Sequence, residues 1–375
     1  MKMDYNVSFD FANTNTMYST HSLHPYPAKF PPQLPKTILK KFAHKGQTIL
    51  DPFCGSGTTL VEARLMGYNA IGVDVNGLSS LLSKVKATPL SDQEYSAVKS
   101  FLIKIKKEIA VWELKRPKIK IKKIEGIEHW FQKNVSEELT HILNLINNLS
   151  DVNVRDFLKI VVSSIIVRVS NQESDTRFAA KNKNIPDNFA LKLFYDRANE
   201  YSEKIMEYSK DIVGNGFLKL LNADSRNLTM LKDKSIDIII TSPPYANTYD
   251  YYLYHKFRKR WLDLDVQFAQ YNEIGSRREY SSLKKPANQW TIDLKKCFSE
   301  MYRLLKKEGL AFIVIGDSVI KKELIKIDKV IQNFMPEIGF EICNIISSDL
   351  SGHSRIFNPT FAQKGKKEHL IILRK

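Results

Sequence analysis

Residues 51–59 read Asp-Pro-Phe-Cys-Gly-Ser-Gly-Thr-Thr and directly follow the short apolar run 48–50. A buried parallel strand that ends in a glycine-rich turn presents backbone N–H groups at its carboxyl end, where open α/β sheets bind ligands. A second apolar run, 236–240, ends in Thr-Ser-Pro-Pro-Tyr at 241–245. We therefore expect two rigid corners at one edge of a sheet. The first corner suits a cofactor, and the second suits a planar group that carries an NH₂.

The glycine-rich turn does not fit two common nucleotide-binding motifs. A P-loop has a lysine after its last glycine, whereas Thr58 follows Gly57 here. In a dinucleotide-binding turn the third glycine would fall at Leu60. We therefore reject nucleotide hydrolysis and dinucleotide binding as functions of this turn.

Together the two corners resemble those of the S-adenosylmethionine-dependent DNA amino-methyltransferases of the Ser-Pro-Pro-Tyr type, which methylate N4 of cytosine or N6 of adenine. The likeness includes His-Pro-Tyr-Pro-Ala-Lys-Phe-Pro at 24–31, Gly-Val-Asp at 72–74 and Ala-Asp at 223–224. It covers residues 19–84 and 216–375. The resemblance implies an α/β fold with a seven-stranded Rossmann-like methyltransferase sheet, mostly parallel with the last strand antiparallel, and an inserted mainly helical lobe.

Three parts are expected along the chain. Residues 1–85 hold an N-terminal arm and the cofactor loop, 86–215 form the helical lobe, and 216–375 carry the catalytic motif and the last strands. Apolar patterns predict strands at 49–51, 69–74, 217–221, 236–240, 310–315, 340–346 and 369–373. They predict long helices at 94–112, 135–149, 151–170 and 188–210, and shorter ones at 35–42, 58–66 and 78–85.

Composition narrows the class of protein. Apolar residues make up 43% of the 375, and no apolar run is long enough to cross a membrane. The N-terminus lacks the pattern of a signal peptide, so we expect a cytoplasmic protein of a bacterium or archaeon. Three widely spaced cysteines, without a Cys-x-x-Cys pair, argue against disulfides and against a zinc site, and no metal is expected.

The net charge of +16 favours a polyanionic partner. A lysine-rich proteome would explain the excess equally simply, but the charges cluster at 115–123 and 256–260. Clustering favours nucleic acid. The expected partners are double-stranded DNA and a cognate restriction endonuclease, with the oligomeric state left open.

The resemblance implies that S-adenosyl-L-methionine occupies the first corner. The turn leads into a helix N-terminus, which attracts a carboxylate such as that of the methionine moiety. Asp74 would take the ribose hydroxyls and Asp224 the adenine amino group, although acids at strand ends also cap helices. His24 has an alternative interpretation as an ordinary loop histidine. The expected cofactor-binding residues are His24, Pro27, Ala28, Phe30, Asp51, Pro52, Phe53, Gly55, Ser56, Gly57, Thr58, Thr59, Asp74, Asn76, Asp224 and Thr241.

The second corner suits amino-group methylation. An exocyclic amino nitrogen is a poor nucleophile because its lone pair is delocalised into the ring, so acceptors must hold its two protons. The Ser242 side chain and the Pro243 carbonyl are rigidly placed for this, and Tyr245 can stack on a flipped base. A C5-cytosine mechanism needs a nucleophilic cysteine, usually in a Pro-Cys pair, which this sequence lacks. The expected catalytic residues are Ser242, Pro243, Pro244 and Tyr245.

Serine at 242 favours N4 of cytosine, because Ser-Pro-Pro-Tyr is commoner in such families and a neutral hydroxyl does not repel the ring N3. N6-adenine methylation is the second hypothesis. RNA guanine-N2 methylation is a third, although residues 1–18 leave no room for the usual N-terminal RNA-binding domain. A catalytically silent DNA-binding protein is the fourth.

Basic residues after the second corner are candidates for phosphate contacts, with a solvated helix face as the alternative. Base reading is assigned to the helical lobe 86–215, and 271–285 is expected to be a mobile loop over the flipped base. Leu253, Phe257 and Trp261 share a face that is expected to pack on the sheet. The expected DNA-binding residues are Lys256, Arg258, Lys259, Arg277 and Arg278.

Overall fold

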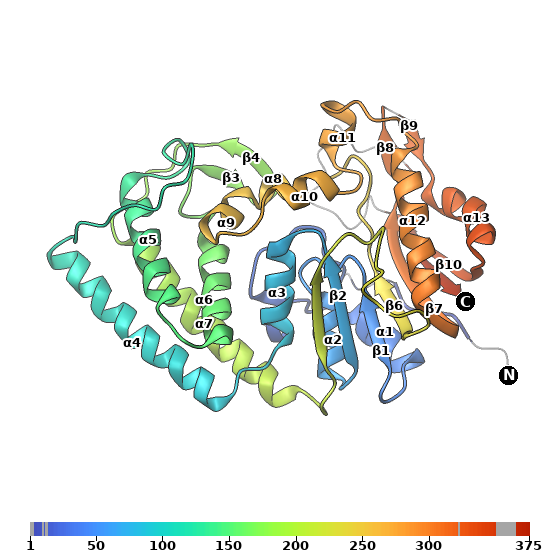
Figure 1. Cartoon of the computed structure of the whole chain (residues 1–375), viewed down its shortest axis with the longest axis horizontal. Coiled ribbons are helices and arrows are strands. Elements are labelled where there is room, and N and C mark those ends of the chain that lie inside the picture. The colour runs from blue at the N-terminus through green and yellow to red at the C-terminus, as the bar shows by residue number, and fades with distance from the viewer. Residues whose placement is uncertain (1–3, 10, 12–13, 322, 350–364) are drawn as a thin grey trace.

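Seven strands form one mixed sheet in the computed structural model, which describes residues 4–9, 11, 14–321, 323–349 and 365–375 (Figure 1). The strands are β1 (Thr48–Asp51), β2 (Asn69–Asp74), β5 (Leu218–Asn222), β6 (Ile236–Thr241), β7 (Leu305–Gly316), β10 (Glu341–Asp349) and β11 (Lys367–Arg374). They are ordered β10-β11-β7-β6-β1-β2-β5 across the sheet.

Strand directions confirm the predicted fold class. β1 pairs in parallel with β2 and β6, β2 with β5, and β6 with β7. The last strand, β11, is antiparallel to both of its neighbours, β7 and β10. β2 has the predicted bounds, whereas β7 begins five residues before the predicted 310. Exposed charged residues at 306–308 hide this extension from an apolar pattern.

Both faces of the sheet are covered, so its central strands are apolar on both sides. Ile49 and Leu50 are neighbours in β1 and belong to two different apolar clusters. On one face lie α1 (Gln33–Phe42), α2 (Thr58–Leu65) and α3 (Gly77–Ala87), preceded by the 3₁₀ turn Ser19–Ser22. On the other lie α12 (Gln289–Leu304) and α13 (Ile327–Ile338).

The chain between α3 and β5 is mainly helical, as predicted. It forms α4 (Asp92–Leu114), α5 (Lys133–Asn147), α6 (Val152–Ile165) and α7 (Phe189–Asp211), which lie to one side of the sheet (Figure 1). A hairpin of β3 (Gln172–Ser174) and β4 (Arg177–Ala180) was not predicted, and α6 ends five residues before the predicted 170. Side-chain caps begin two of these helices, the Ser91–Glu94 capping box at α4 and Asp151 at α6.

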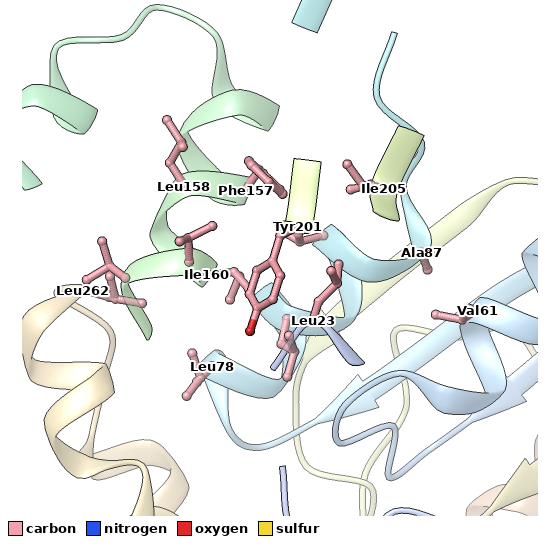
Figure 2. Packing of buried hydrophobic residues seen from close by; sticks show 14 of the residues in the cluster. Leu23, Val61, Leu78, Ala87, Phe157, Leu158, Ile160, Tyr201, Ile205 and Leu262 are labelled. Atoms are coloured by element: carbon pink, nitrogen blue, oxygen red, sulfur yellow. The ribbon is translucent and has the colours of Figure 1, made fainter. Parts of the chain in front are cut away.

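The helical insert packs against α3 and the preceding 3₁₀ turn through a continuous apolar core. Figure 2 shows Leu158 and Ile160 of α6 facing Leu78 of α3, with Leu23 and Tyr201 between them. These side chains are all buried. The division of the chain at residues 85 and 215 stays a prediction, but one apolar core contains residues on both sides of residue 85.

Short helices follow β6 and lie above the sheet (Figure 1). They are α8 (Tyr251–Tyr254), α9 (Lys256–Trp261), α10 (Gln267–Asn272) and α11 (Arg277–Ser281), and a hairpin of β8 (Ser318–Ile320) and β9 (Glu323–Ile325) follows β7. Phe257 packs on Trp130, Phe131 and Phe178 of the insert rather than on the sheet, which corrects the expectation for that face. None of the described helices has the length and apolar character needed to cross a membrane.

Candidate active site

The two predicted corners open into one cavity of about 730 Å³ at the carboxyl ends of β1, β2 and β6. Gly55 of the first corner and Pro243 of the second both line it. A cofactor bound by one corner would therefore face a group held by the other. The expected site residues that line the cavity are Pro27, Ala28, Phe30, Asp51, Phe53, Gly55, Ser56, Thr58, Asp74, Asn76, Asp224, Ser242, Pro243, Pro244 and Tyr245.

Four other expected cofactor residues lie outside the cavity and stabilise the two corners through their contacts. Gly57 has a φ of +80°, and a Cβ there would lie 2.8 Å from the Ser83 hydroxyl. The Thr59 hydroxyl donates to the Ile240 carbonyl at 3.2 Å, so it joins α2 to β6. The Pro52 carbonyl accepts from Ser225, and the Thr241 hydroxyl donates to Asp51. These residues support the cavity wall and do not line it.

His24 is buried outside the cavity, which corrects its assignment to the cofactor. One ring nitrogen lies 2.8 Å from the Ser163 hydroxyl, and the other lies 2.7 Å from the Pro25 carbonyl. Both nitrogens are thus engaged within the protein. His24 joins the 24–31 segment to α6, and its residue type alone could not reveal this.

Asp74 organises the first corner. One carboxylate oxygen accepts the Gly55 N–H at 2.9 Å, and the other accepts the Asn76 N–H at 2.8 Å. The Asn76 side-chain oxygen caps α3 at Leu78. Its amide nitrogen is buried and has no hydrogen-bond partner among the described residues. An unsatisfied buried donor in a cavity wall marks a place where a polar ligand atom is expected.

Two acids at this corner have raised pKa values. Burial raises the pKa of Asp51 to about 6, and the Thr241 hydrogen bond opposes this shift. Burial likewise raises the pKa of Asp74 to about 6, opposed by the N–H groups of Asn76 and Gly55. Both groups are therefore mainly ionised at neutral pH.

Asp224 is fixed by a cation that the sequence analysis missed. Its oxygens accept from Nε and Nη2 of Arg226 at 3.0 and 2.7 Å, a two-pronged ion pair. Arg226 also contacts Asp293 of α12 at 3.1 Å. Asp224 therefore lines the cavity in a set orientation, with Ser225 beside it.

The second corner is anchored through its last proline. The Trp290 indole N–H donates to the Pro244 carbonyl at 2.9 Å. Among the described residues, no donor hydrogen-bonds to the Pro243 carbonyl, so this acceptor is available in the cavity wall. The Tyr245 hydroxyl donates to Glu368 at 2.7 Å, and burial raises the pKa of Tyr245 well above its ordinary value.

Aromatic rings that the analysis did not single out complete the cavity. Tyr26 stacks on Tyr251 at 5.9 Å between ring centroids. Phe9 and Phe11 come from the expected N-terminal arm. In the sequence they are two aromatic residues within a polar stretch, and a local pattern cannot predict which part of the fold they contact. Tyr249 and Tyr252 also line the cavity.

Two charged residues in the cavity wall were also missed. Lys29, inside the 24–31 segment, donates from its ammonium to the His21 carbonyl at 2.9 Å. Glu273 accepts the Tyr251 N–H at 2.7 Å, and burial raises its pKa to about 8. Glu273 is thus largely protonated at neutral pH.

Two of the expected phosphate-binding residues are fully buried, so the prediction is wrong for them. Arg258 donates to the Ser163 carbonyl at 3.0 Å and pairs with Asp175. Burial lowers the pKa of Lys259 to about 8. Their burial results from tertiary packing. The insert contacts the polar side of α9 through Ser163 and Asp175, so this side of the helix is not exposed to solvent. Lys256 is half-buried, with its ammonium 5.9 Å from the Phe178 ring centroid.

Arg277 and Arg278 begin α11 and do not line the cavity. The Arg278 backbone N–H donates to Asp250 at 3.1 Å, and its guanidinium lies over the Tyr252 ring at 5.9 Å. Tyr252 does line the cavity. DNA contacts by these two arginines stay a prediction, and their segment consists of short helices rather than one open loop.

Asp317, Asp328 and His369 place possible metal-ligand atoms within 4.8 Å of one another. Asp317 is already satisfied by the Lys326 ammonium at 2.9 Å and by the backbone N–H groups of Ile327 and Lys367. These contacts and His369 lower the pKa of Asp317 to about 2. The cluster therefore works as an internal ion-pair network at the end of β7.

The parallel sheet with an antiparallel last strand, and the cavity across its central carboxyl ends, define a Rossmann-like methyltransferase. A family model described as DNA methylase matches residues 4–77 and 236–372, more than half of the chain. The chain belongs to this family, the N6/N4 DNA methylases, whose members are S-adenosylmethionine-dependent. It is a site-specific DNA methyltransferase, as predicted.

Two relatives align over most of the chain. The type II methyltransferase M.MvaI of Kocuria varians is 27% identical, with 88% of this chain and 83% of the relative covered. M.MjaII of Methanocaldococcus jannaschii is 25% identical, with 87% and 77% covered. Among solved structures, TrmN of Thermus thermophilus aligns over 93% of this chain and 50% of its own, with 12% identity and a TM-score of 0.37.

Proposed function

We propose that this protein transfers a methyl group from S-adenosyl-L-methionine to the exocyclic N4 of cytosine in a specific double-stranded DNA sequence. One observation carries the proposal: Ser242 and Pro243 share a single cavity with Gly55 and Asp74. The target base reaches the cavity by flipping out of the duplex, because its amino group is inaccessible inside the stack.

The residues of the first corner fit the cofactor. The buried Asn76 amide offers a donor without a partner among the described residues, and the Asp74 carboxylate beside it accepts from hydroxyl groups. Lys29 and the start of α2 would hold the methionine carboxylate. Asp224, fixed by Arg226, would accept from the adenine amino group. When bound, the cofactor supplies an activated methyl group on a sulfonium.

The second corner orients the amino group. Trp290 occupies the Pro244 carbonyl, whereas the Pro243 carbonyl remains available to accept one amino proton. The Ser242 hydroxyl accepts the other, so the nitrogen lone pair turns toward the methyl donor. Rigid prolines set this geometry before the base arrives. The methyl then passes in one direct displacement, without a covalent enzyme intermediate.

N6-adenine methylation is the second candidate, because the same two acceptors would hold an adenine amino group. Serine at 242 supports cytosine: a neutral hydroxyl next to the ring does not repel the N3 lone pair. The names of the relatives, type II methyltransferases, support a cognate restriction endonuclease as a partner.

The DNA surface that we propose is the basic segment 115–123 between α4 and α5. Lys118, Lys120 and Lys123 are exposed, while Ile119 packs against the apolar core and holds the segment in place. Lys122 donates to the carbonyl of Trp261 at 2.7 Å, at the end of α9. Two short helices that meet at His255, α8 and α9, join that point to the cavity residue Tyr251, and at 1.5 Å per helical residue they span at most about 15 Å. One turn of DNA spans about 34 Å, so a duplex at the cavity reaches the segment.

Transfer of a labelled methyl group to double-stranded DNA, followed by mass spectrometry of the nucleosides, tests the proposal. We expect N4-methylcytosine at one sequence. N6-methyladenine would select the second candidate. Labelled RNA in the absence of labelled DNA would overturn the proposal.

A further inference from the structure

One face of α3 is polar although it is buried. Starting at the N-cap, Asn76, Ser79, Ser83 and Lys86 follow one another at intervals of three, four and three residues, so they share one side of the helix. All four side chains are buried. Buried polar groups are expected to have hydrogen-bond partners, so the contacts of this face show which segments it holds in place.

Two of these side chains bind successive carbonyl groups of the first corner. The Ser83 hydroxyl donates to the Gly55 carbonyl at 3.0 Å, and the Lys86 side-chain nitrogen donates to the Ser56 carbonyl at 2.8 Å. A neutral amine and an ammonium both donate, so the second contact does not depend on the charge of Lys86. Neither Ser83 nor Lys86 lines the cavity. Both carbonyls are therefore directed at α3 rather than into the cavity.

The same face holds the segment that precedes α1. The Lys86 backbone carbonyl, in the last turn of α3, accepts from the Thr20 hydroxyl at 2.8 Å. The Ser79 hydroxyl lies 2.9 Å from the hydroxyl of Tyr26, which lines the cavity. One side of α3 thus contacts both the glycine-rich turn and the chain that lies across it.

The orientation of the carbonyls determines that of the neighbouring N–H groups. The Gly55 carbonyl and the Ser56 N–H belong to one trans peptide, in which they point in opposite directions. Holding this carbonyl at α3 therefore turns the Ser56 N–H toward the cavity. Among the described residues, the N–H groups of Ser56 and Thr58 donate to no acceptor, and both residues line the cavity. Thr58 begins α2, so these two donors suit a carboxylate.

We propose that Ser83 and Lys86 are positioning residues, which keep the first corner in the orientation that receives the carboxylate of the cofactor's methionine moiety. The inference rests on the proposed placement of that carboxylate at this corner. Ser83 aims the Ser56 N–H, and Lys86 keeps the Ser56 carbonyl out of the cavity. Gly57 follows Ser56, so without Lys86 the peptide between them rotates at little steric cost. Its carbonyl oxygen would then repel a carboxylate.

Two forms of the cofactor that differ only in this carboxylate test the inference. In calorimetry, the full-length wild type should bind S-adenosylmethionine more tightly than decarboxylated S-adenosylmethionine. Lys86→Met and Ser83→Ala should each weaken binding of S-adenosylmethionine roughly 10-fold, because hydrogen bonds to a charged group are lost. Binding of the decarboxylated form should change less than about two-fold. The KM for S-adenosylmethionine should rise roughly 10-fold, with kcat at saturation within about three-fold of wild type.

Matched controls lie on the same helix. Lys84→Met removes an ammonium that pairs with Asp156 of α6 at 2.7 Å, and Ser80→Ala removes a hydroxyl that has no hydrogen-bond partner among the described residues. Both should keep the wild-type preference between the two cofactor forms. Thermal unfolding of each variant is measured in parallel. If Lys86→Met does not fold, Ser83→Ala carries the comparison, because it removes a single oxygen atom.

The possible outcomes separate this inference from the proposed function. A wild type that binds both cofactor forms equally, or variants that lose affinity for both forms to the same extent, would overturn the positioning role. A wild type that shows the expected cofactor preference but transfers no methyl group to DNA would instead overturn the proposed function.

Discussion

The Thr241 hydroxyl donates to the Asp51 carboxylate at 2.6 Å, and this bond ties the last residue of β6 to the last residue of β1. The two residues precede the two corners of the cavity. Because both are fully buried, their separation defines how far the cofactor corner lies from the Ser-Pro-Pro-Tyr corner. The relative placement of donor and target therefore depends on a hydrogen bond between adjacent parallel strands.

Replacing Thr241 with Val should weaken both folding and cofactor binding. The change removes a donor to a buried carboxylate at nearly constant side-chain volume, so we expect a loss of about 1–3 kcal/mol in the free energy of unfolding. Denaturant unfolding and calorimetry with S-adenosylmethionine measure the two effects. Thr229→Val, at an exposed position, is the control. Unchanged unfolding in Thr241→Val would contradict the role of this bond.

Ser242→Ala should nearly abolish methyl transfer and leave the cofactor corner intact. Loss of one preorganised acceptor is expected to lower kcat by roughly 10²- to 10³-fold, with the cofactor Kd within about two-fold of wild type. Tritium transfer to plasmid DNA measures kcat. Ser299→Ala, on the exposed side of α12, should behave as wild type. Loss of cofactor binding in Ser242→Ala would count against the separation of the two corners.

Cofactor affinity should fall as the pH drops below about 6. Ribose hydroxyls donate to ionised Asp74, so binding favours the deprotonated form of a group whose pKa lies near 6. The effect on stability has the opposite sign. Because the pKa of Asp74 in the folded protein is raised above the ordinary value of 3.8, this group makes stability decrease as the pH rises from about 4 to about 6.

Asp74→Asn separates these effects. The variant should bind the cofactor more weakly at pH 8 and lose the part of the pH dependence below 6 that Asp74 contributes. Calorimetric titrations from pH 5 to pH 8 provide the comparison. A wild-type affinity that stays flat across this range would show that Asp74 does not meet the cofactor.

Changing Lys118, Lys120 and Lys123 together to Gln should weaken DNA binding at every sequence. Each phosphate contact contributes about one unit to the slope of log affinity against log salt, so the slope should fall by about two to three. Fluorescence anisotropy with specific and random duplexes at several salt concentrations measures it. The matched control changes Lys45, Lys232 and Lys307 to Gln, three exposed lysines near the amino ends of β1, β6 and β7. Equal slopes in both triple variants would remove segment 115–123 from the DNA surface.

Arg258→Met should destabilise the fold rather than act on DNA contacts. The guanidinium is fully buried and satisfies the Ser163 carbonyl and Asp175, so its loss should cost about 2 kcal/mol or more. Thermal unfolding measures this loss. If the variant has wild-type stability but a smaller slope of log DNA affinity against log salt, Arg258 contacts a phosphate after all.

The sequence by itself determined the sheet, its two corners and the family. Glycines at 55 and 57 adopt positive φ, and two prolines stiffen the turn after β6, so these features depend on a few neighbouring residues. Apolar runs located six of the seven strands to within three residues at each end. Only the tertiary structure decided which polar groups face the cavity.

His24, Arg258 and Lys259 have residue types that are common in functional sites, but all three are buried. The packing of the helical insert against other segments buries them, and a local sequence pattern does not reveal such packing. Phe9 and Glu368 line the cavity although they lie far from both motifs in sequence. Local preferences act over one or two turns of chain. Burial and hydrogen-bond partners depend on contacts between segments that lie 83 to 139 residues apart in the sequence, and those contacts exist only once the chain is folded.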